Sequence, residues 1–194
     1  MTKIGIILGS TRPGRKGQVV AEWVAKAGAE QVPDAVFEIV DLADFALPLL
    51  DEPHPPAFGR YTKDHTRAWS EAISGYDGFV FVTPEYNRSI PGALKNALDF
   101  VYTEWNNKAA GFVSYGMQGG ARAVEHLRLI LSELKVATVR SQVSLSLFVD
   151  FTTTDPAEPG AQFAPGPHQA QTLATMLGEV VAWSGALKPL RDGV

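Results

Sequence analysis

The sequence predicts an α/β fold in which a five-stranded parallel sheet is covered by helices on both faces. Three continuous runs of apolar or small residues, at 3–8, 79–83 and 109–115, have the composition of parallel strands that are buried on both sides. Helical patterns lie between the strands, and this alternation indicates right-handed βαβ crossovers. With 194 residues the chain can form one substantial core, so we expect a single domain over 1–194.

Two further runs, 36–41 and 139–147, interleave polar and apolar side chains, as half-exposed strands do. Placing them at the sheet edges gives the strand order 2-1-3-4-5, which is the flavodoxin-like arrangement with three layers. Apolar residues at helical spacing predict helices around residues 19–27, 69–76, 124–134 and 173–181. The two proline-rich connections, 46–59 and 148–167, are long enough to be lids or interface arms, or else simply mobile loops.

The composition argues against several classes of function. Seventeen Lys and Arg against 21 Asp and Glu give a net charge of −4, which offers no broad attraction to nucleic acid. The chain has no cysteine, and this excludes disulfides, thiolate nucleophiles and cysteine-based metal sites. No apolar run approaches the roughly 18 residues that span a bilayer, and the first residues read as a strand rather than a secretory leader. We therefore expect a soluble cytoplasmic protein whose redox chemistry would need a cofactor.

Ligands of open α/β sheets bind beyond the carboxyl ends of the strands where the strand order reverses, here after the first and third strands. The segment 9–18 (GSTRPGRKGQ) combines glycine, hydroxyl residues, Arg12 and Arg15 just before a helix, which suits a phosphate monoester. It lacks the Gly-Lys-Ser/Thr ending of a Walker A loop and the G-x-G-x-x-G of dinucleotide folds. A solvated basic turn is the alternative for this loop taken alone.

The segment after the third strand, 84–99 (PEYNRSIPGALKNALD), carries groups that suit a planar heteroaromatic ligand. Tyr86 offers a flat surface, and Asn87 with nearby backbone N–H groups offers fixed donors, whereas an ordinary loop with a surface tyrosine is the alternative. Pro91 marks a helix start. After the fourth strand, 114–123 (SYGMQGGARA) is glycine-rich and allows close backbone approach to a ring. Three such loops after three central strands indicate one shared crevice.

In residues 8–12, 84–99 and 114–123 the chain resembles the NADPH-dependent FMN reductase family, which includes quinone, azo and chromate reductases. The likeness lies in the order, spacing and loop placement of the motifs over nearly the whole chain, and Pro-Glu-Tyr-Asn is its most specific part. The resemblance implies a flavodoxin-like fold, tightly but noncovalently held FMN, and two-electron, ping-pong reduction by NAD(P)H. It also implies a small-molecule electron acceptor, and homodimers or homotetramers with FMN near the subunit interface. Quinones, azo dyes, free flavin and metal oxyanions are all possible acceptors.

The resemblance also implies which residues hold the cofactor. Those expected around the phosphate are Ser10, Arg12, Arg15, Lys16, Gly17 and Gln18. Those expected at the ring are Pro84, Glu85, Tyr86 and Asn87, and those at its other edge or the ribityl chain are Ser114, Tyr115, Gly116 and Gly119. Relatives often have serine where Arg15 stands and asparagine near Gly17, so phosphate contacts here can differ. No side chain is expected to be catalytic, because the cofactor performs the chemistry, and no metal site is expected.

Some assignments outside these motifs stay open. The histidines all lie outside the three loops and receive no catalytic role. Arg15, Lys16 and Arg122 are candidates for the phosphate that distinguishes NADPH from NADH. An electron carrier or flavin-responsive binding module is the main rival function, although such carriers tend to be more acidic than this chain. A Rossmann-type dehydrogenase that reads ribose through Asp41 is a second rival, and it lacks the glycine fingerprint.

Overall fold

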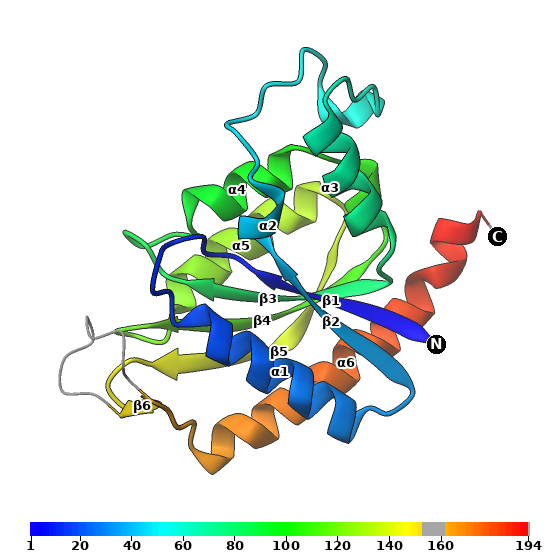
Figure 1. The fold of residues 1–194 in the computed structure, drawn as a ribbon. Helices are drawn as coiled ribbons and strands as arrows, with labels where there is room; N and C mark the ends of the chain where they lie inside the picture. The colour runs from blue at the N-terminus through cyan, green and yellow to red at the C-terminus, as the bar shows by residue number, and fades with distance from the viewer. Residues whose placement is uncertain (153–161, 194) are drawn as a thin grey trace.

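The computed structural model describes residues 1–152 and 162–193, which form a parallel sheet between two helical layers (Figure 1). The strands of the sheet are β1 (Thr2–Leu8), β2 (Ala35–Asp41), β3 (Gly78–Pro84), β4 (Ala109–Gly116) and β5 (Ala137–Ser146). Their order is β2-β1-β3-β4-β5 and every neighbouring pair is parallel, which confirms the predicted topology. The central strand β3 is buried along its whole length, whereas the edge strands β2 and β5 are partly exposed.

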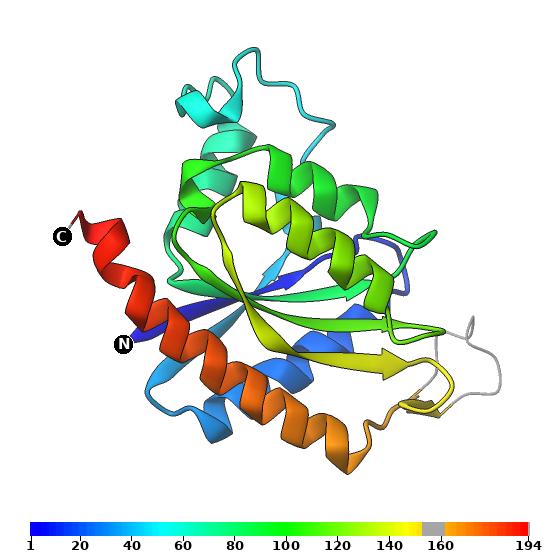
Figure 2. The ribbon, with the colours of Figure 1, turned by 180° about the vertical axis from the view of Figure 1, so that it is seen from behind.

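Helices cover both faces of this sheet (Figures 1 and 2). One face is covered by α1 (Gly17–Gln31) and α6 (Pro167–Asp192). The other face is covered by α2 (Leu42–Phe45), α3 (Asp64–Ser74), α4 (Gly92–Asp99) and α5 (Ala121–Glu133). Two 3-10 turns, η1 (Pro56–Phe58) and η2 (Thr103–Trp105), belong to this second layer. Pro91 directly precedes α4, where it was predicted to mark a helix start.

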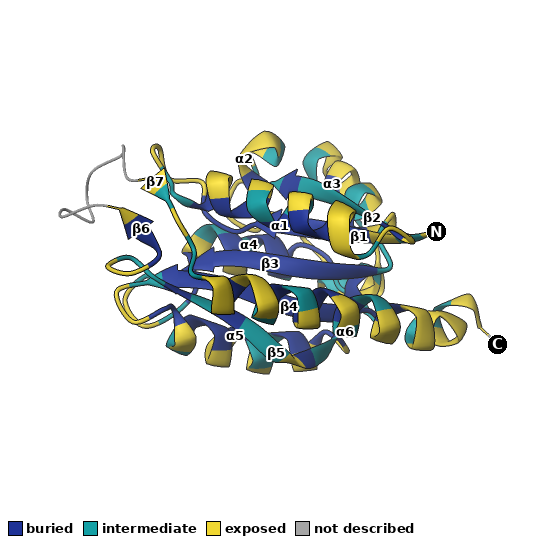
Figure 3. Cartoon of the chain, turned by 90° about the horizontal axis from the view of Figure 1, so that it is seen from below, coloured by how far each residue is buried: buried dark blue, intermediate teal, exposed yellow. Residues whose placement is uncertain are grey.

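The core is divided by the sheet because successive side chains of a strand point to opposite faces. Phe79 and Phe81 of β3 pack into the layer that holds η2, and Val80 and Val82 pack against α1 and α6. Trp105 lies with its ring centroid 4.9 Å from that of Phe79. Figure 3 shows β3 enclosed between the two helical layers, whose outward faces are exposed. This rigid centre holds the carboxyl ends of β1, β3 and β4 in fixed relative positions.

The structure contains elements that the sequence pattern did not predict. Helix α2 starts directly after β2, and the Asp41 side chain accepts a hydrogen bond from Ala43 N at 2.9 Å at its start. Strands β6 (Phe151–Thr152) and β7 (Gln162–Phe163) form a short antiparallel pair within the second proline-rich connection. Residues 153–161 of that connection lie outside the described residues. Across 1–152 and 162–193, no helix combines the length and apolar character that crossing a membrane requires.

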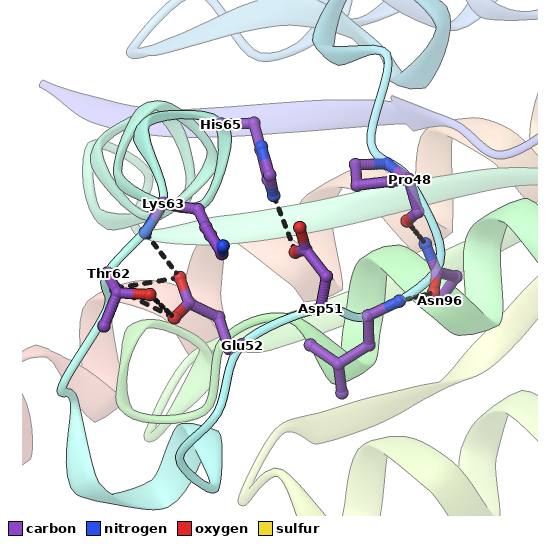
Figure 4. Close-up of polar contacts among 8 residues, drawn as sticks. Pro48, Asp51, Glu52, Thr62, Lys63, His65 and Asn96 are labelled. Atoms are coloured by element: carbon purple, nitrogen blue, oxygen red, sulfur yellow. Dashed lines mark hydrogen bonds and ion pairs between the residues drawn. The ribbon is translucent and has the colours of Figure 1, made fainter.

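The first proline-rich connection is held to α3 and α4 by polar contacts (Figure 4). Glu52 accepts hydrogen bonds from the backbone N–H of Thr62 at 2.8 Å and of Lys63 at 2.9 Å. Burial raises the pKa of Glu52, but these amide hydrogen bonds outweigh it and lower the pKa to about 2. Asn96 of α4 donates to Pro48 O at 2.7 Å and accepts from Leu50 N at 3.0 Å. The connection is therefore anchored at several points along its length.

Candidate functional site

The three loops that were predicted to bind a ligand meet at one cavity of about 200 Å³, beyond the carboxyl ends of β1, β3 and β4. Its lining residues come from four separate segments: Arg12, Arg15, Lys16, Pro84, Glu85, Tyr86, Tyr115, Gly116 and Leu147. All but Leu147 were predicted as cofactor-binding residues. Leu147 follows the carboxyl end of β5, and its N–H donates to Gly116 O at 3.0 Å, which brings it to the cavity. Its place at the same sheet edge is the signal that could have found it.

The loop after β1 forms a cationic end of this cavity. Arg15 N donates to Arg12 O at 3.1 Å around a turn with Pro13 and Gly14 at its centre, and Gly14 has a φ of 70°. Proline followed by a residue at positive φ is the pattern of a type II turn. The turn places Arg12, Arg15 and Lys16 just before the first turn of α1, where backbone N–H groups have no partners within the helix. This end of the cavity therefore suits a phosphate group.

Gly17 brings the start of α1 close to β1 and β4. A Cβ atom at this position would lie 2.6 Å from Leu8 Cδ1 and 2.8 Å from the Tyr115 hydroxyl, so a larger residue requires displacement. Burial raises the pKa of Tyr115, and the nearby Tyr86 adds to this effect. Tyr115 therefore keeps its proton over the physiological pH range and stays a neutral hydroxyl beside the loop after β1. The side chain of Gln18 instead donates to Glu22 at 2.9 Å along the outside of the helix.

Arg15 forms an ion pair with Asp41 at the end of β2. The two side chains are 18% and 17% exposed, so the pair is shielded from water. The parallel register of β1 and β2 aligns Leu8 with Asp41, which places the carboxylate beside the loop that follows β1. Arg15 thus lines the cavity with its guanidinium directed to a protein carboxylate, and Asp41 holds the loop after β1 against β2 and α2. The alternative of Asp41 as a ribose reader gains no support from this arrangement.

A second contact joins the first loop to the loop after β3. The hydroxyls of Ser10 and Tyr86 lie 2.9 Å apart, and Ser10 is fully buried. Tyr86 and Ser89 exchange backbone hydrogen bonds at 2.9 and 3.0 Å, which closes a tight turn over Asn87 and Arg88. Both of these residues have positive φ, at 49° and 71°, as a two-residue type I′ turn requires. Asn87 is exposed at the tip of this turn.

The loop after β4 is supported from beneath by residues that do not line the cavity. Ser114 Oγ donates to Gly119 O at 2.6 Å. Gly119 and Gly120 have φ values of 71° and 73°, which glycine adopts without strain. Six predicted residues thus lie outside the cavity lining: Ser10, Gly17, Gln18, Asn87, Ser114 and Gly119. Their contribution to cofactor binding stays a prediction.

A larger cavity of about 390 Å³ opens on the other side of the same loop. It is lined by Thr11 and by residues of α2 and α4 and their connections, and no charged side chain contributes to its lining. The chemistry of the residues, rather than the volume, therefore decides between the two cavities. Only the smaller one combines cations, aromatic rings and close backbone, which is the donor set that FMN requires.

Comparison with known proteins places the chain in a family. The model for the NADPH-dependent FMN reductases matches residues 2–150. The chain belongs to this family. It is 40% identical over 163 residues to an NAD(P)H-dependent FMN reductase of Schizosaccharomyces pombe, covering 83% of this chain and 81% of the relative. It is also 37% identical over 132 residues to a quinone reductase of Escherichia coli, covering 64% and 66%.

Solved structures support the fold of this FMN reductase family member. An oxidoreductase from Corynebacterium diphtheriae aligns with a TM-score of 0.71 at 17% identity, over 96% of this chain and 98% of the other. A flavoenzyme NAD(P)H:(acceptor) oxidoreductase from Paracoccus denitrificans aligns with a TM-score of 0.70 at 20% identity, again over 96% and 98%. At such identities the comparison concerns the fold alone, and it confirms the flavodoxin-like architecture. The expected enzyme class, oxidoreductase, and the cofactors FMN and NAD(P)H are confirmed at the level of the family.

Proposed function

We propose that this chain binds FMN noncovalently in the 200 Å³ cavity and transfers hydride equivalents from NAD(P)H to a small-molecule acceptor by a ping-pong mechanism. The observation that carries the proposal is the meeting of Arg12 and Lys16, the start of α1, and the two tyrosines Tyr86 and Tyr115 around one cavity. A quinone is the acceptor we favour. The names of two relatives support it, the quinone reductase of Escherichia coli and a 2-hydroxy-1,4-benzoquinone reductase of Burkholderia, which is 33% identical over 141 residues.

In this proposal the protein binds and orients the cofactor, and bound FMN supplies the hydride and electron chemistry. Arg12 and Lys16 hold the phosphate together with the free N–H groups at the start of α1. Tyr86 and the backbone of the 86–89 turn lie against the ring, and the contact between Tyr86 and Ser10 fixes the distance between the ring and phosphate ends of the site. Tyr115 stays protonated, so it contributes a neutral hydrogen-bonding group rather than a base.

The ping-pong order is part of what the resemblance to the FMN reductase family implies. NAD(P)H and the acceptor would then occupy the same place in turn, and the oxidised nucleotide would leave before the acceptor binds. Initial rates measured at several fixed acceptor concentrations test this order. Parallel double-reciprocal plots are expected, and intersecting plots would show that both substrates bind together.

We propose further that the protein acts in the cytoplasm as a homodimer or homotetramer. The first proline-rich connection supports an interface role, because Leu49 is 85% exposed and Phe58 is 68% exposed on a segment that its polar contacts hold in place. Light scattering of the purified protein is expected to give a mass of two or four chains. A monomer at micromolar concentration would contradict the proposed assembly but would not contradict the proposed cofactor site.

Anaerobic reduction followed in the visible spectrum tests the central proposal. The purified protein is expected to take up FMN, become yellow and lose its flavin absorbance when NADPH is added, and a quinone should restore the colour. A colourless protein that fails to take up added FMN contradicts the proposal. A yellow protein that neither NADPH nor NADH bleaches would instead favour an electron carrier.

A further inference from the structure

The carboxylate of Glu85 is enclosed in the wall of the proposed FMN cavity. Its side chain is 8% exposed, and its backbone N–H donates to Tyr115 O at 3.1 Å. The Glu85 Cβ lies 3.5 Å from the place where a Cβ on Gly116 would stand, so the loop after β4 packs directly against it. A carboxylate in such a position is costly unless charged or hydrogen-bonding partners compensate for lost water.

Arg122, the second residue of α5, interacts with both carboxylate oxygens of Glu85. Its guanidinium forms an ion pair with one carboxylate oxygen of Glu85, and its backbone N–H donates to the other at 3.2 Å. Gly120, which precedes the helix, has no side chain that could cap it, so Glu85 caps α5 from a different loop. Because its guanidinium is paired with Glu85, Arg122 is less available for the phosphate that distinguishes NADPH from NADH, the role that the sequence suggested.

A second contact fastens the same segment one helical turn further along α5. His126 Nδ1 lies 3.0 Å from Ser89 Oγ. Residues 122 and 126 share one face of the helix because they are four positions apart. Glu85 directly precedes the 86–89 turn and Ser89 closes it, so both ends of the turn are attached to α5. The helix therefore determines where the turn lies relative to the cavity.

We infer that Glu85 and Arg122 are positioning residues that fix the 86–89 turn and set the reduction potential of bound flavin by keeping the part of the cavity wall that holds Glu85 electrically neutral. This inference rests on the proposed function. Two-electron reduction increases the negative charge on a flavin ring. An unpaired Glu85 carboxylate would repel that charge, and water screens the repulsion poorly in a largely buried wall. The Arg122 guanidinium neutralises the Glu85 carboxylate, so reduced FMN can bind beside this carboxylate without strong repulsion.

The test measures the midpoint potential and the dissociation constant of FMN for the wild type, Arg122→Ala, Glu85→Gln and the double variant. Arg122→Ala is expected to weaken binding of reduced FMN about tenfold more than binding of oxidised FMN, which lowers the two-electron potential by about 30 mV. Glu85→Gln leaves an unpaired cation and should raise the potential. The double variant removes both charges and should return towards the wild-type potential, so the two single effects are not additive.

Two further variants separate charge from structure. Arg122→Lys keeps the cation and should recover most of the potential, and Arg140→Ala removes an exposed arginine from the amino-terminal half of β5 and should leave it unchanged. If the potentials of all variants coincide while FMN affinity or thermal stability falls, Glu85 and Arg122 act only in folding and the inference is overturned. That outcome leaves the proposed function intact. Failure of the wild type to bind FMN overturns the proposed function itself, and this inference with it.

Discussion

The first proline-rich connection follows α2 and the loop after β1 follows a central strand, and the two use their charged groups differently. In the connection, Glu52 is saturated by hydrogen bonds from Thr62 and Lys63. In the loop after β1, the guanidinium of Arg12 forms no hydrogen bond or ion pair with any residue among 1–152 and 162–193. A charged side chain that is fully hydrogen-bonded within the protein stabilises the fold. A charged side chain without a protein partner beside a cavity is available to bind a ligand.

The core beneath both regions should produce the largest effect on stability. Trp105 is fully buried and packs against Phe79 and Phe81, so Trp105→Ala leaves a cavity in the layer that supports α3 and α4. We expect a loss of about 3–5 kcal/mol in the free energy of unfolding, measured by urea denaturation. Trp183→Ala on the exposed face of α6 is the matched control, and an equal loss there would contradict the packing argument.

Replacing Arg12 should weaken ligand binding without lowering the stability of the fold. A charge-assisted hydrogen bond contributes about 1.5–3 kcal/mol, so Arg12→Ala should weaken FMN binding roughly 10- to 100-fold in a fluorescence titration. The unfolding free energy of the protein without flavin should stay within about 0.5 kcal/mol of the wild type, because Arg12 is exposed. Riboflavin, which lacks the phosphate, serves as the control ligand. An equal loss of riboflavin affinity would place the phosphate elsewhere.

Replacing Glu52 should lower the stability of the fold without changing ligand binding, and this is the smallest of the expected effects. Glu52→Gln removes the carboxylate that accepts from Thr62 and Lys63 next to the start of α3, at a cost of about 1 kcal/mol. The pKa of this carboxyl falls from 4.5 to about 2 in the folded protein. Its contribution is therefore full above pH 4.5 and is lost as the pH falls towards 2.

Urea denaturation as a function of pH measures this contribution. The stability difference between wild type and Glu52→Gln should be largest near neutral pH and should shrink on acidification below pH 4.5. FMN affinity should not change, since Glu52 does not line the cavity. A difference that stays constant from about pH 7 to about pH 2.5 would show that the carboxylate is not responsible.

The sequence predicted the strands, their order and most of the cavity, because these depend on local patterns. Buried parallel strands are apolar throughout, and the loops after β1, β3 and β4 carry their own turn chemistry, such as Pro13-Gly14 and Pro91. Short elements were missed. Helix α2 has four residues, and β6 pairs with β7 over two, so neither is long enough to carry a periodic signal.

The sequence by itself thus determined the architecture, and it predicted the edge of the sheet at which we expect a phosphate-bearing aromatic ligand to bind. The tertiary structure alone decided which charges around the cavity are paired. Arg15 meets Asp41 because the register of β1 and β2 aligns their ends, and Glu85 meets Arg122 because β3 and β4 lie side by side. Pairing of this kind joins residues far apart in the chain, where composition and spacing carry no information on distance. Within residues 1–152 and 162–193, Arg12 lines the cavity with a guanidinium that has no hydrogen-bond or ion-pair partner, and we expect it to contact the ligand.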